Sequence, residues 1–133
     1  MGFAPAFTSQ VEWRNDIALV ALSGELDMAT APLLEGCLAP VEADGPASIM
    51  VDLRDLMFID STGLGVLLRA RGRAEANGHR LLVVGASPTA RRLFELTGTQ
   101  FLIDQQAVGV IHRFARNRPG QDLMLDSDGG PSG

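Results

Sequence analysis

The sequence predicts a single α/β domain whose sheet is mixed, mostly parallel, with four or five strands and about four helices. The chain has 133 residues, of which 46% are hydrophobic, and this suits one domain with a substantial core. Short apolar runs alternate with longer amphipathic segments, a pattern typical of parallel strands joined by helices. At the start, however, two apolar runs follow one another directly and predict an antiparallel hairpin at the sheet edge.

The first two strands are predicted over residues 7–13 and 17–23, because Arg14-Asn15-Asp16 between them is a turn sequence. The run over 48–53 is apolar almost throughout, which is typical of a central strand covered on both faces. Residues 54–58 are interpreted as a link to the next helix.

Helical spacing of apolar residues predicts helices between these strands. The first covers 30–41, with Asp27 or Thr30 as its cap. The second follows residues 59–63 and runs to about Asn77, where an Asn-Gly pair ends it.

The last part of the predicted domain begins with a strand over 80–84. A short helix over 88–97 follows, because Ser87 is a good cap before Pro88 and Gly98 is a good stop. The remaining predicted segments are a short fifth strand over 101–104, a final helix over 105–116, an N-terminal extension over 1–6 and a disordered tail over 117–133, so that the domain spans 7–116.

The charge composition excludes several classes of function. All 11 basic residues are arginine, so there is no lysine for a Walker A phosphate loop or for Schiff-base chemistry. Cys37 is the sole cysteine, which excludes paired-cysteine zinc sites, and we expect neither a metal nor a cofactor. A net charge of −5 argues against nucleic acid or an anionic membrane as the partner. With no apolar run near the ~20 residues of a membrane span and no secretory signal, we expect a cytoplasmic protein.

The loop Asp60-Ser61-Thr62-Gly63 is the strongest candidate site, because functional loops of α/β domains collect where helices follow strand ends. Ser61 is expected to cap the following helix by accepting a hydrogen bond from the N–H of Gly63 or Leu64. A phosphate on this serine suits the positive end of the helix dipole, and Gly63 and Gly65 leave the backbone open. Its charge of about −1.5 to −2 disturbs a partner's surface more than the fold. These residues therefore predict a switch that acts on binding.

Several motifs along the chain, taken together, carry a family resemblance. The strongest is the segment over 58–67, Phe-Ile-Asp-Ser-Thr-Gly-Leu-Gly-Val-Leu. The others are Ser23-Gly24-Glu25-Leu26-Asp27, Val51-Asp52-Leu53, Arg80-Leu81-Leu82-Val83-Val84, Ala86-Ser87-Pro88, Arg92-Leu93-Phe94 and Gly98. In this order and spacing, over about residues 7–116, they resemble a STAS domain of the bacterial anti-sigma factor antagonist family.

The resemblance implies a STAS-type fold and a binding protein without catalytic residues. Its partner would be an anti-sigma factor that is also a serine kinase with a histidine-kinase-type ATP fold, and binding would release the sigma factor. The kinase would end the signal by phosphorylating the serine after the loop aspartate, here Ser61, and a serine phosphatase would reset it. The frequent family loop is D-S-S-G, whereas this chain has Thr62 in place of the second serine. Thr62 is therefore the alternative acceptor.

The resemblance also assigns a partner-binding surface. Asp27 matches the family aspartate that lies beside the phosphorylated loop and meets the kinase, and Asp60 precedes the acceptor. Antagonists of this kind are monomers, and we expect the same here. The expected partner-binding residues are Asp27, Asp60, Ser61, Thr62, Gly63 and Gly65.

Other interpretations stay open at this point. The chain could be a scaffold or accessory STAS subunit of a transport or stress-signalling complex, with the Ser61 loop as a docking surface without phosphate turnover. Nucleotide binding by the domain itself rests on the glycine-rich loop alone, and the dinucleotide motif fails because Leu68 occupies its third glycine position. Arg69 and Arg73 are interpreted as a solvated helix face, with docking of an acidic partner as the alternative.

Overall fold

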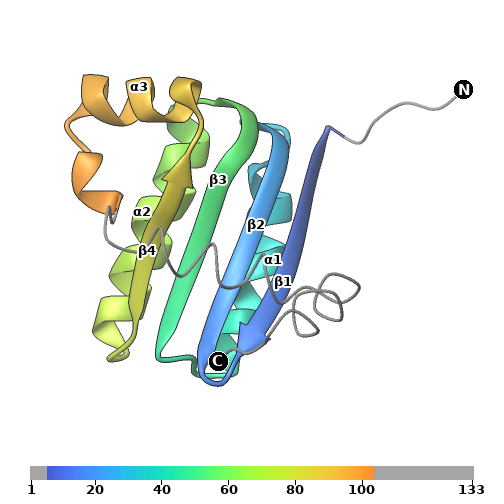
Figure 1. The fold of residues 1–133 in the computed structure, drawn as a ribbon, viewed down its shortest axis with the longest axis vertical. Helices are drawn as coiled ribbons and strands as arrows, with labels where there is room; N and C mark the ends of the chain where they lie inside the picture. The colour runs from blue at the N-terminus through green and yellow to red at the C-terminus, as the bar shows by residue number, and fades with distance from the viewer. Residues whose placement is uncertain (1–5, 104–133) are drawn as a thin grey trace, which may run out of the picture.

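The computed structural model describes residues 6–103, which form a four-stranded sheet with helices packed against it (Figure 1). The strands lie in the order β1-β2-β3-β4, antiparallel between the first two and parallel between the others. The predicted mixed sheet with an N-terminal hairpin is therefore confirmed. The elements are β1 (Phe7–Arg14), β2 (Ile17–Leu26), α1 (Ala31–Ala43), β3 (Ser48–Ile59), α2 (Ser61–Ala76), β4 (Arg80–Ala86), α3 (Pro88–Thr97) and the 3-10 helix η1 (Gln100–Leu102).

The main core lies between the sheet and the helices α1 and α2, which run behind the sheet in Figure 1. Alternate residues of β2 point into this layer, because successive side chains of a strand face opposite sides. Val20 and Leu22 are at most 1% exposed, and they join Leu34 and Leu38 of α1 in one apolar cluster. This layer fixes α1 and α2 against the central strands β2 and β3.

Strand β3 is longer than predicted, because residues 54–58 continue the strand instead of linking it to the next helix. Its register against β2 shifts between Ala21 and Ser23 and again between Gly24 and Glu25. Each shift is a bulge that adds one residue to β3. The buried side chains are therefore spaced by three, at Leu53, Leu56 and Ile59, and this spacing breaks the simple alternation that identifies strands.

The end of the described chain differs in part from the prediction. The helix over 88–97 is confirmed with both of its ends, since Ser87 Oγ accepts from the N–H of Ala90 at 3.2 Å and Gly98 has φ of 72°. The predicted fifth strand is wrong over residues 101–103, which form the end of η1 and one isolated bridge between Ile103 and Val83. The predicted helix over 105–116 and the tail over 117–133 lie outside the described residues.

Candidate functional site

The candidate loop lies at the shared carboxyl end of the two central strands. Leu26 and Ile59 are paired neighbours in the parallel ladder of β2 and β3. Beyond this pair, the N–H of Asp60 donates to the carbonyl oxygen of Leu26 at 3.1 Å. Asp27 and Asp60 each follow one member of the pair, so the β2–α1 and β3–α2 loops lie side by side. The structure thus brings together the two predicted aspartates, which are 33 positions apart in the sequence.

Asp60, not Ser61, caps helix α2, so this part of the prediction is wrong. The Asp60 backbone is extended, its Oδ1 accepts from the N–H of Gly63 at 3.0 Å, and its carbonyl oxygen accepts from the N–H of Leu64 at 3.0 Å. Aspartate caps as well as serine does, and its negative charge also suits the helix N-terminus. The observed N-cap residue of α2 is therefore one position earlier in the sequence than predicted.

Ser61 is the first residue of α2, and its side chain is exposed. No hydrogen bond within residues 6–103 engages its hydroxyl, because Asp60 already satisfies the N–H of Gly63. Thr62 follows it and is exposed as well. Both candidate acceptors are therefore accessible to an enzyme without any unfolding of the helix.

The two glycines of the loop serve different purposes. A Cβ on Gly63 would lie 2.6 Å from Cγ and 3.0 Å from the carbonyl oxygen of Leu26, so only glycine allows α2 to begin this close to β2. A Cβ on Gly65 would meet just the flexible end of Arg69, at 3.2 Å. Gly63 is thus needed for packing, whereas the packing around Gly65 leaves room for a side chain.

Asp27 shapes the neighbouring loop. Its Oδ1 accepts from the N–H groups of Ala29 and Thr30, both at 3.0 Å, and lies 3.1 Å from Oγ1 of Thr30. Thr30 occupies the N-cap position of α1, but its side chain makes no capping bond and instead donates to the carbonyl oxygen of Glu25 at 2.7 Å. Within the described residues, the hydrogen bonds to the carboxylates of Asp27 and Asp60 all involve Oδ1, so Oδ2 of each carboxylate is not used by the fold.

Three exposed apolar side chains beside the loop were missed by the sequence analysis. Met28 is 74% exposed, Met57 73% and Phe58 45%. Met57 is the extra residue of the second β3 bulge, since Leu56 pairs with Gly24 and Phe58 with Glu25. The only sequence signal for Met57 and Phe58 was the apolar run Leu56-Met57-Phe58 inside a segment that had been interpreted as a link.

Several other charged groups within residues 6–103 pair with one another. Arg69 and Arg73 pair with glutamates of α1, at 3.6 Å and 3.4 Å from Glu35, which favours the solvated-face interpretation over a docking surface. Asp52 is 6% exposed and binds Arg54 through Nε and Nη2, and this hydrogen bond raises the pKa of Arg54 above its ordinary value.

Over residues 6–103, no group of three or more acidic, histidine or cysteine side chains is placed to hold a metal ion. None of the helices described is long and apolar enough to span a bilayer.

Comparison with known proteins identifies the family. Residues 8–115 match the model of the STAS domain, so the chain belongs to the STAS family. It is 39% identical to the anti-sigma-B factor antagonist of Staphylococcus aureus over 84 residues, which make up 63% of this chain and 78% of that protein. Within the STAS family, the chain therefore belongs with the anti-sigma factor antagonists, which are regulators and not enzymes.

Two solved structures are similar to this chain, and the first of them supports the assignment. An anti-sigma factor antagonist from Mycobacterium paratuberculosis is 35% identical with a TM-score of 0.67, and the match covers 75% of this chain and 86% of that one. Bacillus SpoIIAA in its phosphorylated form is 24% identical with a TM-score of 0.61, covering 78% of this chain and 99% of that one. The second similarity concerns the fold alone.

Proposed function

We propose that this chain binds an anti-sigma factor with serine kinase activity, releases the sigma factor, and is switched off by phosphorylation of Ser61. The observation that carries the proposal is an exposed serine hydroxyl, unused by the fold, next to the Asp60 cap and the Asp27 loop. Membership of the anti-sigma factor antagonists supports the partner class. The existence of a phosphorylated SpoIIAA supports the mode of regulation. We further propose a cytoplasmic monomer that a serine phosphatase resets.

The proposed reaction is a phosphoryl transfer catalysed by the partner. Ser61 Oγ attacks the γ-phosphorus of ATP, the bond from that phosphorus to ADP breaks, and the hydroxyl proton passes to a base supplied by the kinase. The product places a charge of about −1.5 to −2 on the first residue of α2. In the free protein this charge faces water and the positive end of the helix dipole, so the fold tolerates it.

In the complex the same charge weakens binding. A phosphate held against the partner's surface loses its water, and an unpaired charge in an interface costs several kcal/mol. A penalty of ~4 kcal/mol weakens binding about a thousandfold. Phosphorylation therefore ends the interaction while leaving the antagonist folded and ready for a phosphatase.

The deciding experiment incubates the full chain with the purified anti-sigma factor kinase of the same organism and Mg-ATP, followed by intact-mass and fragment analysis. We expect one phosphate, on Ser61. Ser61→Ala should fold normally, take up no phosphate at this position and still bind the kinase. Ser61→Asp should bind roughly a hundredfold to a thousandfold more weakly.

Thr62→Ala is the matched control, because it removes the adjacent exposed hydroxyl and leaves Ser61 intact. This variant should be phosphorylated like the wild type. Phosphate on Thr62 alone would move the acceptor by one residue, and phosphate at any other position would disprove the mechanism. Binding without any phosphate transfer would favour the scaffold function instead.

A further inference from the structure

Three large apolar side chains near Ser61 are exposed to solvent instead of being buried. Met28 and Met57 are 74% and 73% exposed, and Phe58 is 45% exposed, whereas the adjacent Leu26 and Ile59 are 0% and 4% exposed. Burying apolar surface is favourable by about 25 cal/mol of free energy for each Å² that is removed from water. A cluster of large apolar side chains on one surface marks a contact site for another macromolecule.

Two of the three side chains, Met57 and Phe58, lie near the end of β3, and the third, Met28, lies in the β2–α1 loop. Phe58 pairs with Glu25 one step before the pair of Leu26 and Ile59, and Met57 is the bulged residue before it. Met28 comes two residues after Leu26 in the neighbouring loop. Ser61 follows Phe58 by three residues. The apolar rim, defined as Met28, Met57 and Phe58, therefore flanks the phosphoacceptor.

We propose that the apolar rim is the docking anchor of the kinase, and that the kinase presents to it an apolar pocket bordered by basic groups. This inference rests on the proposed function and names the contact that holds the partner. Transfer to Ser61 requires its Oγ to come within about 3–3.5 Å of the reacting phosphorus. The surface next to Ser61 is therefore covered by the kinase in every turnover, and Phe58 and Met57 precede Ser61 by only three and four residues.

The basic border of the pocket follows from the charges beside the rim. Asp27 and Asp60 each offer a carboxylate oxygen that the described fold does not use. Glu25, which pairs with Phe58, and Asp55, which precedes Met57 by two residues, are exposed as well. Protein interfaces commonly have an apolar centre with polar groups at the edge, and acidic groups beside the apolar rim match this arrangement. They also steer a basic partner toward the site.

The apolar rim and the acceptor hydroxyl have separable effects. Truncating a rim side chain removes contact area from the complex but leaves the hydroxyl and its helix in place. Met57→Ala and Phe58→Ala should each weaken kinase binding about tenfold to a hundredfold. They should raise KM for the antagonist by a similar factor and leave kcat at saturation nearly unchanged, because chemistry at Ser61 is untouched.

The test measures binding and single-site phosphorylation of full-length variants with the purified kinase and Mg-ATP. Trp13→Ala is the control, since Trp13 is 40% exposed but pairs with Ala18 at the opposite end of β2. It should bind like the wild type. Thermal unfolding accompanies each variant, and Met57→Ala, at a largely exposed position, should melt within a few degrees of the wild type.

The outcomes separate the two proposals. If Ser61 is phosphorylated and both rim variants bind and react like the wild type, the kinase docks elsewhere and this inference is wrong while the proposed function stands. If the wild type neither binds the kinase nor accepts phosphate, the proposed function fails, and the apolar rim loses its assigned partner. A rise in KM for the rim variants but not for Trp13→Ala supports the anchor.

Discussion

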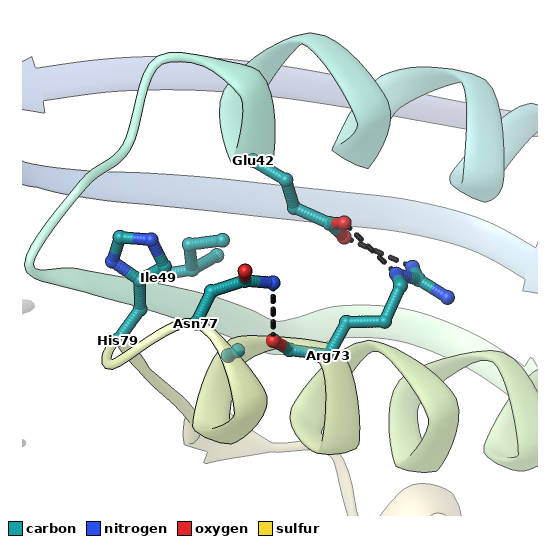
Figure 2. Close-up of a pocket in the computed structure, with 6 residues that line it drawn as sticks. Glu42, Ile49, Arg73, Asn77 and His79 are labelled. Carbon is teal, nitrogen blue, oxygen red and sulfur yellow. Dashed lines mark hydrogen bonds and ion pairs between the residues drawn. The ribbon is translucent and has the colours of Figure 1, made fainter.

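The two ends of helix α2 differ in how their side chains are used. At the Ser61 end, a hydroxyl and three apolar side chains face solvent. At the Asn77 end, Asn77 Nδ2 donates to the carbonyl oxygen of Arg73 at 2.8 Å, and the N–H of His79 donates to that of Ala74 at 2.8 Å. Figure 2 shows Arg73 reaching across to Glu42 of α1, with which it forms hydrogen bonds of 2.9 Å.

The difference separates the stabilising end of the helix from the proposed binding end. The hydrogen bond with Glu42 raises the pKa of Arg73 above its ordinary value, so the guanidinium keeps its charge in this contact. The small pocket that Glu42, Arg73, Asn77 and His79 help to line has a volume of about 20 Å³, which is room for about one water molecule. The polar groups at the Asn77 end thus bond within the fold, whereas Ser61 and the apolar side chains near it remain exposed.

The largest effect on stability is expected from Gly63→Ala. The new Cβ would lie 2.6 Å from Leu26 Cγ, so α2 must move away from β2. Overpacking of this kind costs about 1–3 kcal/mol, and the displaced loop should also bind the kinase less well. Urea unfolding and kinase binding measure the two effects.

Gly65→Ala is the matched control, because its Cβ meets only the end of Arg69. Alanine inside a helix is up to about 1 kcal/mol better than glycine, so this variant should be as stable as the wild type or more so. Equal stabilities of Gly63→Ala and the wild type would contradict the packing role of Gly63.

A smaller effect is expected at the cap. Asp60→Ala removes the acceptor of the Gly63 N–H and should lower the free energy of unfolding by about 1 kcal/mol. Asp60→Asn keeps an equally good cap and removes only the charge. It should therefore lose less stability than Asp60→Ala, while reducing the association rate with a basic partner, which stopped-flow binding measures. If Asp60→Asn lost as much stability as Asp60→Ala, the charge of Asp60, and not its capping hydrogen bond, would be what stabilises the start of the helix.

The smallest effect is expected at the Asn77 end. Arg73→Ala breaks exposed ion pairs with Glu35 and Glu42, which are typically worth about 0.2–1 kcal/mol. The loss in urea unfolding should shrink at high salt, and kinase binding should not change. Weaker kinase binding by this variant would show that the binding surface extends along the whole helix, which breaks the contrast between its ends.

Sequence patterns predicted the parts of this fold that follow regular periods. The hairpin, the order of strands and helices, and both ends of α3 follow from alternation, turn residues and caps. The extension of β3 was missed because its two bulges replace a period of two with Leu53, Leu56 and Ile59. Ser61 was placed as the cap because serine and aspartate cap equally well, and the sequence does not show which residue first becomes helical.

The position of the candidate loop could be predicted from the sequence, but the side chains exposed around it could not. The Asp60-Ser61 loop could be located from the strand and helix around it. Its neighbour Asp27 came from a family resemblance, since nothing local indicates that β2 and β3 end side by side. The exposure of Met28, Met57 and Phe58 depends on strand register and on what fails to cover them, which is tertiary information.

Because Met57 is a bulged and exposed residue, the proposed docking anchor can vary while the fold stays the same. Leu56 and Ile59 point into the core and hold the strand, while the residue inserted beside them carries no packing duty. Its side chain can change in size or polarity without moving the strands or the acceptor helix. A cell with several antagonists of this kind could assign each to a different kinase by altering such outward positions, and so insulate parallel stress signals that share one fold.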